Sequence, residues 1–329
     1  MLTLMKKMGA LIGAVSLATS VAYAQTEPEK NDITIGLPLN TATFIPLYLA
    51  DEEGLFNDEG LNVSLVAFKG GTDLVRGMVA GAVDFGVGAL AEALVGVETG
   101  QGIKVFYSGF NMTVFDWYAI PSIKSLADTK GARFGVTTFG SSTDFLTRYA
   151  LSTHDIDPEK DVQIIQGGGS APRLAAMEAG QLDVNIFAPP EKFIAADLGY
   201  NLIMRQDEIA EDYPFHVFYT KEDTLQSMPN TIKALLRAYV KGVRLAKADK
   251  DRSVALLVKR VGLEEAYAGR AYDDFIDAIF EDGRLPSEAG MKAFWDMGIQ
   301  SGTYKEEWPL DSFWDPTYVD TFEEWKPAE

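Results

Sequence analysis

The segment Gly140-Ser141-Ser142-Thr143 places a glycine and three hydroxyl groups between a predicted strand and a predicted helix. Backbone N–H groups at the beginning of a helix have no partner within the helix and carry partial positive charge. Glycine lets a ligand approach the backbone closely, and the hydroxyl groups can donate hydrogen bonds. The segment therefore predicts a contact with a polar or anionic head group such as a carboxylate or a sulfonate. The alternative is that Ser142 or Thr143 only caps the helix, and both roles can hold together.

A second polar loop follows the first predicted strand and carries Thr41, Thr43 and Phe44. The two hydroxyl groups can bind a polar ligand group, whereas Phe44 can pack on an apolar or aromatic ligand body or belong to the core. A later Gly-rich turn offers Gly71 and Thr72, which can contact a ligand or simply begin a helix. We include these five residues among the candidate ligand contacts.

Ligands of open parallel sheets bind at the carboxyl ends of the strands. The loops after the third predicted strand of each lobe add Ala89 and Glu191 to the candidates. Asn111 follows the fourth predicted strand directly and is included as well. His216 lies on a returning strand, where it can touch a ligand or serve as a structural histidine.

The sequence gives no sign of a catalytic, metal or cofactor site. It has no cysteine and only two histidines, His154 and His216, which excludes thiolate ligands, disulfides and a cysteine nucleophile and argues against a transition-metal site. The stretch from Gly86 to Ala91 fits a dinucleotide-binding pattern superficially, but it follows the third strand of its unit and lacks the expected acidic partner. We therefore expect no catalytic residue, no metal and no cofactor.

A repeat with an offset of 99 residues indicates how these loops are positioned. When residues 36–84 are aligned with 135–183, nine positions are identical, and both segments end in Met-x-Ala-Gly-x-x-Asp. Both segments also follow the same order of apolar strands, turns and helices. A repeat of this length predicts two similar α/β lobes, and ligands favour the cleft between two such units.

The pattern of apolar residues gives the elements of each lobe. In the first copy we expect strands at 33–37, 61–68, 83–87 and 103–110 and helices at 44–53, 72–80 and 91–99. In the second copy we expect strands at 132–137, 162–166 and 183–187 and helices at 144–152, 173–179 and from 191 onward. One more strand at 215–219 and a mostly helical remainder follow. Strands that alternate with helices predict parallel sheets, and the chain crosses between the lobes near 115–121 and 212–218.

The first 24 residues have the pattern of a secretory signal peptide, with Lys6 and Lys7 before an apolar run and Ala22-Tyr23-Ala24 at the cleavage site. A membrane anchor is the alternative, but the apolar run is too short to span a bilayer. Removal of the signal changes the formal charge from −19 to −21 and leaves about 305 residues, enough for two lobes. Such an acidic chain is not expected to bind nucleic acid, which needs a basic face.

The chain resembles the periplasmic solute-binding proteins of ABC importers, in the group that binds alkanesulfonates, taurine, nitrate and thiamine-precursor pyrimidines. The resemblance covers about residues 33–300. It is carried by these segments: Pro46-Leu-Tyr-Leu-Ala50, Glu53-Gly-Leu-Phe56, Glu59-Gly-Leu-Asn-Val63, Ala80-Gly-Ala-Val-Asp-Phe-Gly86, Leu126-Ala-Asp-Thr-Lys-Gly131, Gly140-Ser141-Ser142 and Ala179-Gly-Gln-Leu-Asp183.

The resemblance implies a type II two-lobe hinge fold, with a mostly parallel, helix-flanked sheet in each lobe and the ligand cleft between them. Lobe 1 would comprise residues 25–120 and 212–329, and lobe 2 residues 121–211. The loops 41–44 and 140–143 would contact the ligand from opposite sides. Members that bind strong anions often add a basic residue, for which Arg173 and Lys69 are the available positions. Arg173 fits a helix position that the family commonly fills with arginine, and Lys69 can face solvent, so the absence of a clear basic cleft residue argues against a sulfonate or nitrate ligand.

These observations predict a non-catalytic, monomeric periplasmic protein that captures a small organic ligand with a polar or anionic head and an apolar or aromatic body. It would close by hinge rotation and present its lobes to an ABC permease in the inner membrane. Two alternatives stay open. The protein could be an enzyme related to the pyrimidine synthase of eukaryotes that shares this fold, or a ligand-sensing subunit of a membrane receptor.

Overall fold

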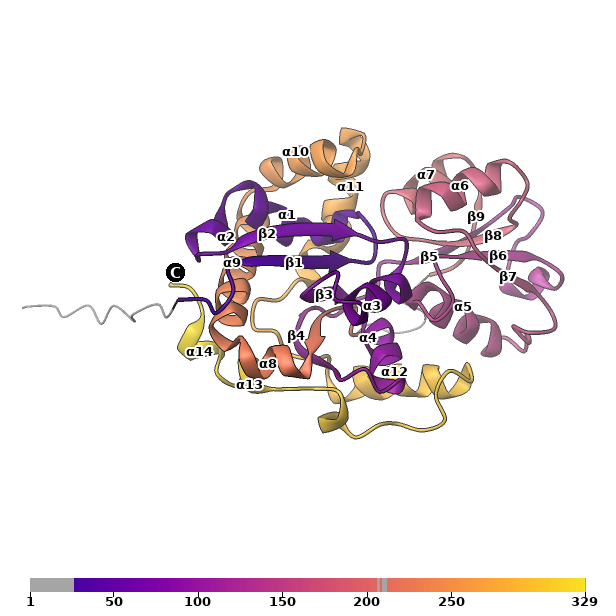
Figure 1. Cartoon of the computed structure of the whole chain (residues 1–329). Helices are drawn as coiled ribbons and strands as arrows, with labels where there is room; N and C mark the ends of the chain where they lie inside the picture. The colour runs from indigo at the N-terminus through magenta and orange to yellow at the C-terminus, as the bar shows by residue number, and fades with distance from the viewer. Residues whose placement is uncertain (1–26, 206–207, 209–211, 329) are drawn as a thin grey trace, which may run out of the picture.

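Two five-stranded sheets form the centres of two lobes in the computed structural model, which describes residues 27–205, 208 and 212–328 (Figure 1). The first sheet, in the order β2-β1-β3-β10-β4, contains β1 (Asp32–Leu37), β2 (Asn62–Ala67), β3 (Phe85–Gly88), β4 (Ile103–Phe110) and β10 (His216–Lys221). The second sheet, in the order β7-β6-β8-β5-β9, contains β5 (Asp116–Ala119), β6 (Arg133–Val136), β7 (Gln163–Gln166), β8 (Val184–Phe187) and β9 (Asn201–Met204). The predicted signal peptide lies outside the described residues.

Four strands of each sheet run in one direction, and the fifth strand is reversed. β10 pairs antiparallel with both β3 and β4, and β5 pairs antiparallel with both β8 and β9. The other pairs, β1 with β2 and β3 and β6 with β7 and β8, are parallel. The expected α/β fold with two mostly parallel sheets is therefore confirmed.

The 99-residue repeat reappears as matching strand registers. Ile35 is paired with Phe85 in the first sheet, and Phe134 is paired with Val184 in the second, each 99 residues later. The final aspartate of each repeat does the same work: Asp84 accepts a hydrogen bond from the Thr34 N–H, and Asp183 accepts one from the Arg133 N–H, both at 2.9 Å. In both lobes, therefore, an aspartate just before the third strand is hydrogen-bonded to the backbone of the first strand.

Helices flank both sheets. In the first lobe they are η1 (Ala42–Phe44), α1 (Ile45–Glu52), α2 (Leu55–Asp58), α3 (Gly71–Val79) and α4 (Leu90–Glu98). In the second lobe they are η2 (Leu126–Thr129), α5 (Ser142–Ser152), α6 (Ser170–Glu178) and α7 (Glu191–Asp197). The C-terminal part adds α8 (Glu222–Ser227), α9 (Pro229–Ala248), α10 (Lys250–Val261), α11 (Glu265–Phe275), η4 (Ile276–Ala278), α12 (Glu288–Gln300), η5 (Leu310–Ser312), α13 (Thr317–Asp320) and α14 (Phe322–Trp325). Among the residues described, none of these helices has the length and apolar character of a membrane span.

The C-terminal helices complete the packing of both lobes. The long helix α9 lies against α1 so closely that a Cβ on Gly242 would stand 2.2 Å from the Pro46 carbonyl oxygen. Helix α12 contacts the second lobe, where Phe294 stacks on Phe145 of α5 with 5.3 Å between ring centroids. The two-lobe division at residues 121 and 211 stays a prediction.

Two chain crossings join the lobes and hydrogen-bond to each other. The Tyr213 N–H donates to the Asn111 carbonyl at 3.0 Å, and the Phe215 N–H donates to the Phe110 carbonyl at 3.1 Å. The first crossing leads directly into β5, a strand within the segment that we expected only to be extended. Neither β5 nor β9 was expected as a strand, because neither shows the alternation of apolar and polar residues that marks a half-buried strand.

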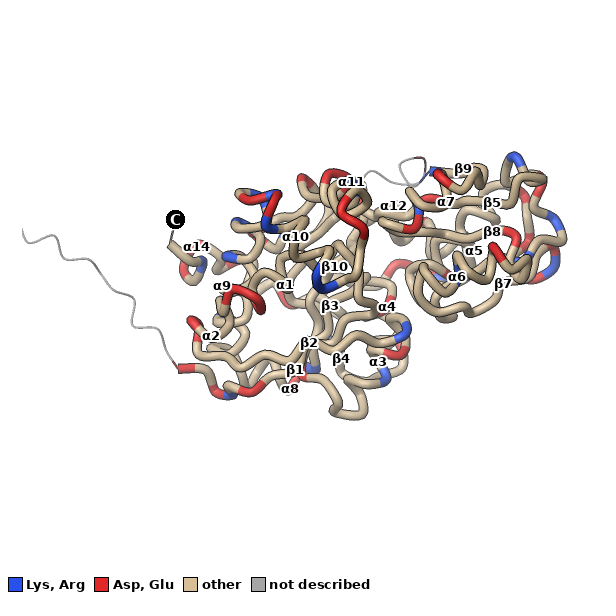
Figure 2. The backbone as a smooth tube through the Cα atoms, turned by 90° about the horizontal axis from the view of Figure 1, so that it is seen from above, with Lys and Arg blue, Asp and Glu red and all other residues tan. Residues whose placement is uncertain are grey.

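Acidic and basic residues are interspersed along both lobes (Figure 2). Several of them pair, and the deepest example is Glu59, whose two carboxylate oxygens each accept a hydrogen bond at 2.6 Å from Arg237 and Lys241 of α9. These two ion pairs hold α9 against the turn that follows α2.

We expect Asp183→Asn to lower the free energy of unfolding by about 1–3 kcal/mol, because the Arg133 N–H and guanidinium lose a charged acceptor. Hydrogen bonds from Arg133 lower the pKa of Asp183, so this stabilisation is present above the ordinary pKa of an aspartate and is lost as the pH falls further. Urea unfolding followed by circular dichroism should show a difference that shrinks toward about pH 3. The control Asp73→Asn removes only an exposed pair with Arg76 and should change stability by less than about 0.5 kcal/mol. An effect of Asp183→Asn that does not change with pH would contradict the assignment.

Candidate functional site

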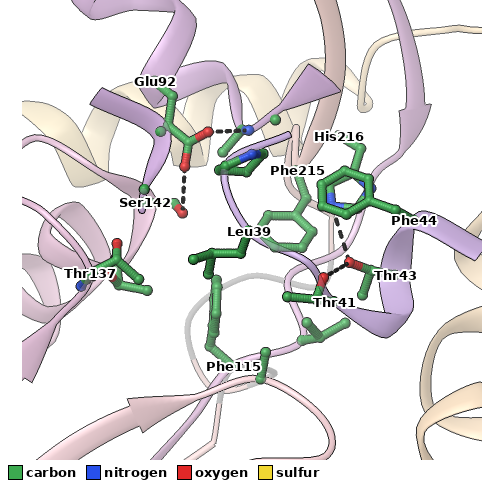
Figure 3. Close-up of a pocket in the computed structure, with 18 residues that line it drawn as sticks. Leu39, Thr41, Thr43, Phe44, Glu92, Phe115, Thr137, Ser142, Phe215 and His216 are labelled. Atoms are coloured by element: carbon green, nitrogen blue, oxygen red, sulfur yellow. Dashed lines mark hydrogen bonds between the residues drawn. The ribbon is translucent and has the colours of Figure 1, made fainter. Parts of the chain in front are cut away.

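A partly enclosed cavity of about 40 Å³ lies between the lobes, where the carboxyl ends of β1, β3, β6 and β8 meet the two crossings (Figure 3). Its wall is mainly apolar, with these residues: Pro38, Leu39, Phe44, Val114, Phe115, Ala188 and Phe215. The volume leaves room for a few water-sized groups.

The first lobe contributes a short chain of polar contacts to the wall. The hydroxyl groups of Thr41 and Thr43 share a hydrogen bond of 2.9 Å, and the Thr43 hydroxyl lies 3.3 Å from His216 Nε2. All three residues line the cavity, as does Phe44. Thr41, Thr43, Phe44 and His216, which were separate candidates in the sequence, thus lie together at the cavity.

His216 is an uncharged part of this wall. Its ring stacks on Phe44 at 4.3 Å and on Phe215 at 4.7 Å between ring centroids. Burial lowers the pKa of His216 to about 3, so the imidazole carries no charge at neutral pH. It can offer a hydrogen bond or an aromatic face to a solute, but no positive charge.

The second lobe contributes the hydroxyl groups around the beginning of α5. Thr137, Ser141 and Thr143 bond to one another at 2.7 to 3.0 Å, and the Thr143 hydroxyl also accepts the Thr137 N–H at 2.9 Å. Thr143 lines the cavity, but its hydroxyl and that of Ser141 are thus engaged within the lobe. Ser142 differs, because its side chain points to the first lobe.

The partner of Ser142 is Glu92 of α4, which sequence analysis did not identify. The Ser142 hydroxyl donates to Glu92 Oε1 at 3.3 Å, and the Ala89 N–H donates to Glu92 Oε2 at 3.1 Å (Figure 3). Glu92 therefore joins helix beginnings from both lobes across the cavity.

Burial raises the pKa of Glu92 to about 7, although the hydrogen bonds from Ala89 and Ser142 oppose the shift. The carboxyl group has room only because two neighbours are glycines. A Cβ would stand 2.0 Å from Glu92 at Gly71 and 2.4 Å from it at Gly88. One signal was available in the sequence: Glu92 is the third residue of a helix, where a glutamate often accepts the N–H of the capping residue.

The remaining candidates lie outside the cavity lining. The Thr72 hydroxyl donates to the Phe139 carbonyl of the other lobe at 2.9 Å, so it joins the lobes near the cavity. The Gly140 N–H is taken by Asp144 at 2.9 Å. Asn111 belongs to the first crossing and donates to the Arg284 carbonyl at 2.8 Å. Ser141 is held in the hydroxyl cluster described above.

Glu191 lies in a neighbouring hollow of about 250 Å³ that shares Leu39 and Thr41 with the cavity. Burial raises the pKa of Glu191, and the nearby Arg173 partly offsets this effect.

Of the thirteen sequence candidates, eight line the cavity between the lobes: Thr41, Thr43, Phe44, Gly71, Ala89, Ser142, Thr143 and His216.

Neither expected basic residue reaches the cavity. Arg173 is buried. Its guanidinium donates hydrogen bonds to the carbonyl groups of Gly168, Gly135 and Ile186 and to the Ser170 hydroxyl. Lys69 is exposed. The cavity lining, as far as the chain is described, holds one carboxyl group and no lysine or arginine. The same described residues contain no group of three histidines or carboxylates placed to hold a metal ion.

Comparison with known proteins identifies relatives of this chain. The profile of the NMT1-like family matches residues 26–259. The putative binding protein YtlA of Bacillus subtilis is 22% identical over 271 residues, which are 76% of each chain. The bicarbonate transport ATP-binding protein CmpC of Synechocystis is 26% identical over 67% of this chain, but the match spans only 36% of that protein.

Solved structures share the fold at low sequence identity. The ligand-binding component of an ABC-type import system from Staphylococcus aureus has a TM-score of 0.72 at 16% identity, with 88% of this chain and 98% of that chain covered. The alkanesulfonate-binding protein SsuA of Xanthomonas axonopodis, bound to MOPS, has a TM-score of 0.70 at 18% identity, with 83% and 94% covered. The desulfurization enzyme DSZB also shares the fold, with a TM-score of 0.61 at 15% identity and 90% and 99% covered.

We expect Glu92→Gln to become more stable relative to the native chain as the pH rises. The unfolded glutamate ionises near 4.5, whereas the folded one resists ionisation up to about 7, so the native chain loses stability between these values. The amide does not titrate, and the difference between the two proteins should grow by about 3 kcal/mol from pH 4 to pH 8. Thermal or urea unfolding across this range measures it.

The matched control is Glu98→Gln, at the exposed end of the same helix. It should show no comparable change with pH. If the native chain and Glu92→Gln responded to pH in the same way, Glu92 would not be a buried titrating group.

Proposed function

This chain belongs to the NMT1-like family, and on that premise we propose that it is the solute-binding component of an ABC-type importer, which captures a small organic solute between its two lobes. The observation that carries the proposal is the cavity between the lobes, whose walls come from both lobes and from both crossings. A cavity of this kind is formed when two lobes close around a solute, and it is a common place for ligands.

Closure depends on direct contacts between the lobes and on the crossings as hinges. The Thr72 hydroxyl reaches the Phe139 carbonyl, and Ser142 reaches Glu92, so both contacts must break when the cavity opens. The paired crossings keep the lobes connected while they rotate. A solute that contacts both walls shifts the population toward the closed form in proportion to its preference for that form.

The family and the relatives support a transport role. YtlA is named a putative binding protein, and a region of the transport ATP-binding protein CmpC is similar to this chain. In our proposal the mature chain is exported to the periplasm by its first 24 residues, acts as a monomer, and presents its closed lobes to a permease in the inner membrane. It binds its solute without chemical conversion.

The first test measures closure directly. Because the sequence has no cysteine, single cysteines can be introduced in each lobe for spin labels or fluorophores. Arg76→Cys on α3 and Lys160→Cys in the second lobe use side chains that are 75% and 80% exposed. A bound solute should shift a broad distance distribution toward the single distance of the closed form.

A screen of small amines, amidines, amino acids, carboxylates and sulfonates supplies the solutes for this test. A solute present at a hundred times its Kd should stabilise the protein by about 2.7 kcal/mol and raise its melting temperature. Binding without a change in the label distance would contradict capture by closure. Conversion of the solute by the purified protein would favour an enzyme, the class to which the fold neighbour DSZB belongs.

A further prediction concerns Thr72→Val, which removes one hydrogen bond between the lobes while it keeps the side-chain volume. The loss of about 0.5–1.5 kcal/mol from the closed form should weaken solute binding by about two- to tenfold. The Thr99 hydroxyl bonds only within its own lobe, so Thr99→Val is the control and should bind normally. Equal affinities of both variants would show that the Thr72 contact does not stabilise closure. Isothermal titration calorimetry with a solute from the screen provides the measurement.

A further inference from the structure

The beginnings of two helices, one from each lobe, converge on the Glu92 carboxyl group. Glu92 accepts the Ala89 N–H at the beginning of α4, and it accepts the hydroxyl of Ser142 at the beginning of α5. Free N–H groups and the helix dipole make such places favourable for an anion. In this cavity the anion is supplied by the protein itself.

We propose that Glu92 is the specificity-determining residue of the cavity: its carboxylate occupies the position of an anionic head group, so that the captured solute presents a hydrogen-bond-donating nitrogen, as in an amine or amidine. The inference rests on the proposed function, since it assumes that the cavity receives a solute. It separates this chain from binding proteins whose ligands are sulfonates or nitrate.

The charges around the cavity support this choice. No lysine or arginine of the described chain lines the cavity, and the donors of Arg173 are already engaged. His216 is neutral. Above about pH 7, where Glu92 is ionised, an anionic solute would therefore meet a carboxylate at close range with no cation to offset the repulsion. A cationic nitrogen would instead find a buried carboxylate, and hydrogen bonds between charged groups are the stronger kind.

The rest of the wall defines the body of the solute. Leu39, Phe44, Phe115 and Phe215 leave the remaining surface apolar, and the Thr41 and Thr43 hydroxyl groups provide one further polar contact. A compact carbon skeleton with a nitrogen at one end matches this division. The hydroxyl of Ser142, which the sequence assigned to the solute, is instead bonded to Glu92, so in this proposal the carboxylate of the first lobe makes the polar contact.

The pH dependence of binding provides a second signature. The groups around Glu92 are Ser142, Ala89, Gly71 and Gly88, and the nearby hydroxyl groups of Tyr213 and Tyr219 are uncharged because burial raises their pKa well above the usual value. Glu92 itself titrates near 7, so a cationic solute should bind about tenfold more weakly for each pH unit below this value. The binding of an uncharged solute would not follow this profile.

The test uses pairs of probes with the same shape and opposite charge. Acetamidinium and acetate form one pair, and benzamidinium and benzoate form the other. Calorimetry at about pH 8 with the mature chain should show that an amidinium binds at least tenfold more tightly than its carboxylate partner. Glu92→Gln should abolish this preference, whereas Glu98→Gln, on the exposed end of α4, should keep it.

A second variant tests the position of the carboxylate without reference to the solute. Glu92→Ala leaves a space of carboxylate size next to the Ala89 N–H and the Ser142 hydroxyl. Formate or acetate should bind there and raise the melting temperature of Glu92→Ala, while the native chain should show no such rise. If neither anion stabilised the variant, Glu92 would not occupy an anion position and the inference would fail.

The outcomes distinguish the inference from the proposed function. Tighter binding of carboxylates, sulfonates or nitrate to the native chain, with closure of the labelled lobes, would overturn the role of Glu92 and leave capture by closure intact. Binding of the amidinium probes without closure would support Glu92 and contradict the importer proposal. If no probe bound, the inference would be overturned, and the importer proposal would be decided by the wider screen with the labelled protein.

Discussion

The pairing of the two crossings is the constraint on which the rest of the structure depends. Backbone hydrogen bonds between Phe110 and Phe215 and between Asn111 and Tyr213 hold both crossings together. Because each crossing continues into a strand, the two sheets are fixed with the carboxyl ends of their parallel strands turned toward each other. The loops at these ends then form a cavity wall in both lobes. The same pairing leaves rotation about the crossings as the simplest large motion of the molecule.

The chemistry of the cavity follows from which groups the lobes bring together. Helix beginnings provide donors, as they do in many anion sites, but Glu92 already accepts the Ala89 N–H and the Ser142 hydroxyl. Aromatic rings shield His216 from water and keep it neutral. The result is a site with the Glu92 carboxyl group as acceptor at one end and apolar side chains around the rest of the wall. In our proposal the specificity of the site thus depends on Glu92, which lies in the first lobe and is hydrogen-bonded to Ser142 of the second.

Much of the fold could be predicted from the sequence because the repeat encodes it. Asp84 and Asp183 stand at matching positions and hold matching backbone groups, so the order of strands and helices was readable in both copies. The strand β5 could not be found, because its four residues are buried on all sides and show no alternation. The different contacts of Ser141, which bonds within the second lobe, and Ser142, which bonds to Glu92, could not be predicted either. They depend on which of the two begins α5, and a shift of one residue turns a side chain to a different face of a helix. Glu92 was missed because a glutamate at this position of a helix ordinarily serves as a cap.

The position of β10 has a consequence for how the chain reaches this structure. β10 lies between β3 and β4, so β4 cannot join the first sheet until residues 216–221 are in place. The second sheet draws all its strands from the continuous stretch 116–204 and can form without either end of the chain. We therefore expect the second lobe to fold first during synthesis and the first lobe to wait for the return of the chain, since contacts distant in sequence form slowly. The first lobe therefore cannot be completed before most of the chain has been made. This order prolongs the interval in which the chain is still unfolded and can be threaded through a pore.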